Sequence, residues 1–312
     1  MIRLGHLTRR DFIGRMAGAA ALLGAPGTLG SMVSSAQQTM PVRAIPGTGE
    51  RLPIVGFGSS KAVLEIPEEG VDPIELVIRV LLERGGRVVD TSPRPEEIDL
   101  EFGRVLQSPG LRDRIFLATK INSDDAETGV AHMRQNQRLF GRRTLDLVQI
   151  ESLRGLADHW PRLRAWKDSG EARYVGVTVQ NAGSYEQLEA FMRAEPADFV
   201  HVNYSVLETQ AEERILPLAR DRGMAVFINR PFMNGGYFGR VSGRELPAWA
   251  ADFDCHAWSQ FSLKYILANP AVTCVLTETT NPEHMEENIG AAFGRFPDAA
   301  QLERMRTLAR TL

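Results

Sequence analysis

The sequence predicts an α/β protein built as a closed (β/α)₈ barrel, with an N-terminal β-hairpin and a C-terminal helix. The chain has 312 residues, of which 43% are hydrophobic, and can bury a large core. Eight short apolar runs rich in β-branched residues alternate with segments of helical periodicity. No linker long enough to divide two domains separates these units, which favours one barrel of the TIM type.

The predicted elements follow in order along the chain. Buried strands are expected at residues 52–58, 87–90, 115–120, 146–150, 174–179, 199–203, 225–229 and 272–276. The stretch RAIPGTGERLPI at 43–54 is typical of a hairpin, and DAAQLERMRTLARTL at 298–312 of a terminal helix. The alternative is a doubly wound open sheet, but no predicted strand is followed by a glycine-rich phosphate loop of the usual spacing.

The first 36 residues have a different composition from the rest. TRRDFIG at 8–14 precedes a short region rich in Gly and Ala, and small residues continue to Ala36. This pattern predicts a twin-arginine export signal cleaved after Ala36, and therefore a periplasmic protein. An amphipathic first helix is the alternative, and the apolar region of about a dozen residues is too short to span a bilayer. We therefore expect a signal at 1–36 and a barrel at 37–312.

The charge balance narrows the class of partner. The whole chain has 36 Lys and Arg against 39 Asp and Glu, a net charge of −3. Residues 1–36 hold four Arg and one Asp, a charge of +3, so residues 37–312 carry −6. This acidic balance argues against nucleic acid and anionic membranes as partners, and we expect a monomer that binds a small molecule. A disulfide between Cys255 and Cys274 and two separate buried thiols are both open.

Polar residues stand where the predicted strands end, which is the end of a barrel that carries chemistry. They are Ser59, which follows Gly58, and Asp90, Lys120, Glu151, Thr178, Asn203, Asn229, Arg230, Thr277 and Glu278. Charges at the ends of apolar strands are costly without partners, so they predict a polar pocket. Structural pairing alone would also account for Asp90 and Lys120.

The motifs at these positions resemble those of the aldo-keto reductases, and in particular a twin-arginine-exported group of them. The resemblance covers almost all of residues 37–312, through IPGTGERLPIVGFG, VVDTSP, IFLATK, LDLVQI, GEARYVGVT, DFVHVNYS, INRPF, LKYILANPAVTCV and NPEHMEEN. It implies a barrel that binds a nicotinamide cofactor in extended form and reduces carbonyls by hydride transfer.

The resemblance also implies the catalytic positions. Hydride addition puts negative charge on the carbonyl oxygen, so an acid must supply a proton and a polar group must hold the oxygen. The family uses a tyrosine as acid, a lysine, an aspartate that anchors the lysine, and usually a histidine. Aligned without gaps over 90–103, the aspartate is Asp90, the lysine Lys120, the tyrosine position Pro95 and the histidine position Glu151. Steroid 5β-reductases are similar in having a glutamate at the histidine position.

Cofactor contacts are implied in the same way. They fall at Gly58, Ser59, Thr178, His201, Asn229, Arg230, Thr279, His284 and Asn288. Val179 stands where the family has a polar residue, and His201 where it has a glutamine. Glu278 precedes Thr279 at the phosphate step, where a carboxylate repels phosphate. These changes predict NAD(P)H binding that is weakened or lost, with NADH favoured over NADPH.

Three functions remain open from the sequence. The first is an oxidoreductase of this family with an unusual site. The second is a barrel that uses Asp90, Lys120 and Glu151 for proton transfer, as an isomerase or lyase does, and the third is a ligand-binding barrel without turnover. Arg230 either binds a carboxylate or phosphate or pairs with Glu151 or Asp90.

Overall fold

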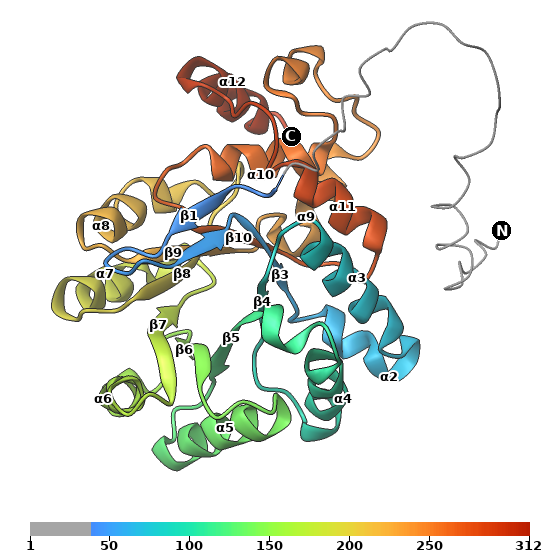
Figure 1. Ribbon diagram of the computed structural model, residues 1–312. Coiled ribbons are helices and arrows are strands. Elements are labelled where there is room, and N and C mark those ends of the chain that lie inside the picture. Colours follow the sequence, from blue (N-terminus) through green and yellow to red (C-terminus); the bar gives the residue numbers. More distant parts are fainter. Residues whose placement is uncertain (1–38) are drawn as a thin grey trace, which may run out of the picture. The chain divides into compact units, whose positions relative to one another are not determined.

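The structure is a computed structural model that describes residues 39–312. The predicted export signal at 1–36 lies outside the described residues. The chain folds into a closed barrel of eight parallel strands, in the order β10-β3-β4-β5-β6-β7-β8-β9 (Figure 1). The predicted (β/α)₈ barrel is confirmed, and the open-sheet alternative is wrong because β10 pairs with both β3 and β9.

The strands lie close to their predicted positions. They are β3 (Val55–Gly58), β4 (Val88–Asp90), β5 (Phe116–Ile121), β6 (Leu145–Glu151), β7 (Ala172–Thr178), β8 (Phe199–Asn203), β9 (Ala225–Asn229) and β10 (Cys274–Thr277). Within each strand, alternate side chains face the barrel interior. In β6, Leu147 belongs to the interior cluster, whereas Val148 and Ile150 pack with the surrounding helices. This alternation carries Glu151, at the end of β6, to the inside.

The expected hairpin is present, but the single strand predicted at 52–58 is wrong. Residues 43–54 contribute to β1 (Val42–Ala44) and β2 (Arg51–Pro53), which pair antiparallel, and β3 starts only at Val55. The chain turns at Ile54, whose N–H donates to Pro41 of the hairpin and whose carbonyl accepts from Val275 of the barrel. Ile45 and Leu52 join the interior cluster, so the hairpin closes one end of the barrel.

Helices surround the strands (Figure 1). They are α2 (Ile66–Glu69), α3 (Asp72–Glu83), α4 (Glu96–Gln107), α5 (Ala126–Leu139), α6 (Leu156–Asp168), α7 (Tyr185–Ala194), α8 (Ile215–Asp221), α9 (Gly236–Val241), α10 (Trp258–Leu267), α11 (Pro282–Gly290) and α12 (Ala299–Ala309). Short 3₁₀ turns are η1 (Ala62–Glu65), η2 (Arg112–Arg114), η3 (Ala182–Ser184), η4 (Gln210–Glu212), η5 (Met233–Gly235) and η6 (Ala248–Phe253).

Two local features explain how the helices are fixed. A Cβ on Gly103 would lie 2.2 Å from the carbonyl oxygen of Leu139, so only glycine lets α4 approach the end of α5 this closely. The predicted terminal helix is α12, which starts at a capping box of Asp298 and Gln301.

Cys255 and Cys274 are both buried and both free, so the disulfide alternative is not what the structure has. No helix within residues 39–312 has the length and hydropathy needed to cross a membrane.

Candidate active site

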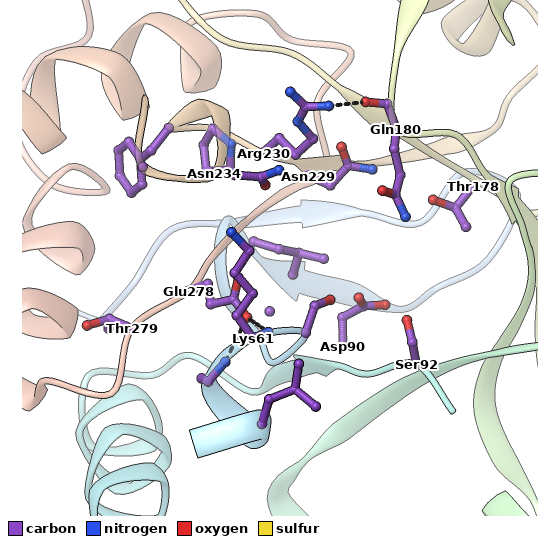
Figure 2. A pocket seen from close by; sticks show the side chains of 18 of the residues that line it. Lys61, Asp90, Ser92, Thr178, Gln180, Asn229, Arg230, Asn234, Glu278 and Thr279 are labelled. Atoms are coloured by element: carbon purple, nitrogen blue, oxygen red, sulfur yellow. Dashed lines mark hydrogen bonds between the residues drawn. The ribbon is translucent and has the colours of Figure 1, made fainter. Parts of the chain in front are cut away.

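One pocket, with a volume of about 580 Å³, lies at the carboxyl ends of the barrel strands. Every strand contributes a residue to its lining, either within the strand or just after it: Gly58, Asp90, Lys120, Glu151, Thr178, His201, Asn229 and Leu276. Figure 2 shows Asp90 and Ser92 on one side of the pocket and Thr178, Gln180, Asn229 and Arg230 on another. The predicted polar pocket is therefore where the strand-end residues meet.

Asp90 and Lys120 form a buried ion pair in this pocket. Lys120 Nζ donates to Asp90 Oδ2 at 2.5 Å and to the carbonyl oxygen of Thr91 at 2.9 Å. Both charged side chains are only 5% exposed. The other carboxylate oxygen of Asp90 accepts from Gln149 Nε2 at 3.3 Å. An ammonium has three N–H donors, so one donor of Lys120 is left for a ligand.

Glu151 borders the same pocket from the end of β6. Its Oε1 accepts from Gln180 Nε2 at 3.1 Å, and its Oε2 is buried without a hydrogen-bond partner. Gln180 follows β7 by two residues, and sequence reasoning missed it. A search for polar residues up to two positions beyond each predicted strand end would have found it.

His201, on β8, is almost completely buried in the pocket floor. Burial lowers its pKa from 6.5 to about 4; the Asp90 charge opposes this shift, and the Lys120 charge adds to it. The imidazole is therefore neutral near pH 7, with one donor and one acceptor nitrogen. Its Nδ1 lies 4.0 Å from Asp90 Oδ1, too far for a hydrogen bond, and neither ring nitrogen has a partner.

Asn229 ends β9, and Arg230 is the next residue. Asn229 Nδ2 donates to the carbonyl oxygen of Val179 at 2.9 Å. Arg230 has a left-handed backbone with φ of 52°, and its Nη1 donates to the carbonyl oxygen of Gln180 at 2.8 Å. Its nearest carboxylate is Glu208, at 3.4 Å. The structural alternative, in which Arg230 pairs with Glu151 or Asp90, is wrong. The guanidinium contacts Gln180 and Glu208 instead.

Pro95 lies outside the pocket. It is the exposed N-cap of α4, and none of the described residues that line the pocket is a tyrosine. The preceding residue, Arg94, lines the pocket instead and was missed by sequence reasoning. Its guanidinium donates to the Ser59 carbonyl oxygen at 2.7 Å and pairs with Asp99 at 3.2 Å. Because Arg94 connects the loop after β3 with Asp99 of α4, it holds the start of α4 in place.

Glu278 follows β10 and folds onto the loop after β3. Its Oε1 accepts from the backbone N–H groups of Lys61 and Ala62, the latter at 3.0 Å (Figure 2). Burial raises the pKa of the Glu278 carboxyl, and these two hydrogen bonds oppose the rise. A pair of backbone donors that could meet a ligand anion is therefore already occupied by a side chain.

The remaining expected cofactor residues divide between pocket and surroundings. Thr279 lines the pocket. Ser59 is buried behind it and accepts from Arg94. Both α11 residues lie outside the lining, with His284 exposed and Asn288 buried. Among residues 39–312, no group of His, Cys, Asp or Glu is arranged to hold a metal ion.

Buried polar atoms without partners gather at this pocket. Among the described residues, five of the nine such atoms belong to Glu151, His201, Asn229 and Arg230. Unpaired buried groups are costly and mark places where a ligand or water completes the bonding. A carboxamide, with two N–H donors and one acceptor oxygen, matches the acceptor Oδ1 of Asn229 and the neutral ring of His201. The part of the pocket lined by His201 and Asn229 therefore fits a nicotinamide.

Comparison with known proteins gives the family. The sequence model of the Aldo/keto reductase family matches residues 56–309. Aldo-keto reductase YhdN of Bacillus subtilis is 25% identical over 183 residues, which are 53% of this chain and 54% of that protein. The NADH-specific methylglyoxal reductase of Escherichia coli is 23% identical over 176 residues, 48% of this chain and 52% of that protein. The chain spans about half the length of the curated relatives it matches.

Solved structures agree on the fold. Aldo-keto reductase AKR11C1 from Bacillus halodurans, in its holo form, superposes with a TM-score of 0.70 at 18% identity, covering 88% of this chain and 97% of that one. An aldo-keto reductase from Klebsiella pneumoniae in complex with NADPH gives 0.71 at 18% identity, covering 87% and 96%. The family match over most of the barrel carries the assignment: the chain belongs to the aldo/keto reductase family.

Proposed function

We propose that this protein is a nicotinamide-dependent oxidoreductase that reduces a carbonyl group. The observation that carries the proposal is the buried Asp90–Lys120 pair, which leaves one lysine N–H open in a pocket lined from every barrel strand. Family membership supports the reaction class. Neighbours of the same fold from Klebsiella pneumoniae were solved with NADP and with NADPH, which supports the cofactor class.

The cofactor, when bound, supplies hydride to the carbonyl carbon. Negative charge then develops on the carbonyl oxygen, and the Lys120 ammonium lies where it can hold that oxygen and give it a proton. Asp90 keeps Lys120 in place through the hydrogen bond between their side chains. Glu151 lies in the same pocket lining, where its Oε1 holds the side-chain amide of Gln180. These roles need no tyrosine at position 95.

We propose protein contacts for the carboxamide end of the cofactor and for its phosphate end. Thr178, His201 and Asn229 would hold the carboxamide, because they line the pocket floor with donors and acceptors. We expect NADH to bind better than NADPH, because the Glu278 carboxylate at the pocket wall repels added phosphate charge.

The test is oxidation of NADH and NADPH with a panel of aldehydes and ketones. The proposal expects slow but measurable turnover, and Lys120→Met should lower kcat by about a hundred- to ten-thousand-fold. Lys120→Arg serves as control, because it keeps the positive charge and a donor while losing a transferable proton. Equal rates in wild type and Lys120→Met would contradict the role of Lys120.

A second candidate is a ligand-binding barrel without turnover. It is favoured by the exposed position of Pro95 and by the Glu278 carboxylate on the Lys61 and Ala62 amides. It expects saturable binding of a small molecule with no NAD(P)H oxidation for any carbonyl. The same panel therefore separates the two functions.

Export to the periplasm is part of the proposal and rests on the sequence of residues 1–36. Replacing Arg9 and Arg10 by lysine should retain the protein in the cytoplasm. Cell fractionation reads this directly, and unchanged export would remove the twin-arginine interpretation.

A further inference from the structure

We infer that the substrate of this pocket carries a carboxylate as well as a carbonyl, and that Arg230 binds the carboxylate. The inference deepens the proposed function, on which it rests for the carbonyl, and names the class of substrate as an oxo acid. It stands on the contacts that the Arg230 guanidinium makes with Gln180 and Glu208.

The guanidinium of Arg230 is only partly used within the protein. Nη1 donates to the carbonyl oxygen of Gln180 at 2.8 Å, which fixes one corner of the group. Nη2 reaches Glu208 Oε1 only at 3.4 Å, and Nε is buried without a partner. The edge made by Nε and Nη2 therefore has no short acceptor. This is an edge on which a carboxylate can accept two parallel hydrogen bonds.

Glu208 does not fill this edge. Its other oxygen, Oε2, accepts from Asn203 Nδ2 at 3.2 Å. If a ligand carboxylate takes the Arg230 edge, Glu208 keeps a partner and is not left unpaired. The weak contact at 3.4 Å is therefore the one that a ligand would replace.

The backbone holds Arg230 in an uncommon conformation. Its φ is 52°, and Met233 and Asn234 in the same loop also have positive φ. Non-glycine residues rarely adopt this region, and such strain persists where the surrounding structure maintains it, often at ligand sites. The hydrogen bond from Met233 N–H to the Arg230 carbonyl oxygen closes the turn that keeps it.

Gln180 connects this edge to the reacting groups. Its carbonyl oxygen accepts from Arg230 (Figure 2). Its side chain donates to Glu151 Oε1. Gln180 thus bridges Arg230 and Glu151 in the pocket wall, so one small molecule can reach both side chains. The charge of the Arg230 guanidinium orients that molecule, because it attracts the carboxylate end. Its carbonyl is then left to face Lys120.

The experiment compares two probes of the same shape, 4-formylbenzoate and 4-formylbenzamide. Binding to the purified protein is measured by calorimetry without cofactor, and reduction is measured with NADH. Wild type should bind the carboxylate about tenfold to a hundredfold more tightly than the amide. Arg230→Gln should abolish this preference, Arg230→Lys should keep part of it, and Arg240→Gln, an exposed control on α9 outside the pocket, should keep all of it.

Three results would overturn the inference. The first is equal affinity of wild type for the two probes. The second is an unchanged carboxylate preference in Arg230→Gln, with the same circular dichroism and Tm as wild type. The third is a weaker NADH affinity in Arg230→Gln with the preference intact, which assigns the arginine to a cofactor phosphate. Carboxylate preference without any NADH oxidation would instead refute the proposed reduction and leave the anion site standing.

Discussion

Replacement of His201 by glutamine should change how the stability of the barrel depends on pH. Burial holds the folded-state pKa of this histidine at about 4, whereas its ordinary value is 6.5. Between these values the unfolded chain binds a proton that the folded chain does not. Stability from this group is therefore full above pH 6.5 and falls as the pH drops toward 4.

The magnitude follows from the two pKa values. Linkage between pH 7 and pH 5 gives a loss of about 2 kcal/mol in the free energy of unfolding from His201 alone. Glutamine is of similar length, remains polar and does not titrate, so His201→Gln should remove that part of the loss. The absolute stability of the variant does not matter, because the prediction concerns the difference between the two pH values.

The assay is urea unfolding at pH 7 and pH 5, followed by far-UV circular dichroism. Wild type should lose about 2 kcal/mol more than His201→Gln between these conditions. His256→Gln, which removes an exposed histidine, should behave as wild type. If wild type and His201→Gln lose the same free energy, the histidine is not held neutral in the pocket floor.

Three further predictions concern the pocket wall, the start of α4 and the terminal helix. Glu278→Gln keeps an acceptor for the Lys61 and Ala62 amides but removes a charge, so the Kd for NADPH in a fluorescence titration should fall about fivefold. An unchanged Kd would mean that the carboxylate does not face the phosphate. Pro95→Tyr should leave kcat within about twofold and stability within about 0.5 kcal/mol, because position 95 is exposed outside the pocket; faster reduction of aldehydes would place the new hydroxyl inside it. Arg306→Ala should lower the free energy of unfolding, measured in urea, by about 1 kcal/mol. Arg306 donates to Glu212 Oε2 at 2.9 Å and to the Tyr265 hydroxyl at 2.8 Å, and an unchanged free energy would mean that these bonds do not hold α12 in place.

The barrel was predictable because its signal is repeated along the chain. Each buried strand shows as a short apolar run, and each strand ends near a polar residue, so Asp90, Lys120 and Glu151 could be placed at one end of the barrel from the sequence. The error at 52–58 has a local cause. Two consecutive strands, β2 and β3, are separated only by Ile54 and therefore appear as one apolar run.

Contacts within the pocket were less predictable, because they depend on side-chain directions in loops. Pro95 was known to differ from the family residue, but its exposure depends on where α4 starts. Arg94 carries no local signal for a pocket, since loops commonly contain such residues, and Gln180 is indicated only by its position two residues after β7. Arg230 could be placed at a strand end, yet its partner Glu208 lies in the loop after β8, and nothing in their spacing indicates a contact.

Calorimetric titration of the purified protein with NADH and NADPH tests the central claim most directly, because carbonyl reduction requires the cofactor to enter the pocket. The proposal predicts saturable one-site binding, with NADH tighter than NADPH and with weaker binding to a variant that lacks the Asn229 acceptor, Asn229→Ala. Absence of binding by either cofactor at millimolar concentration would contradict the proposed oxidoreductase function.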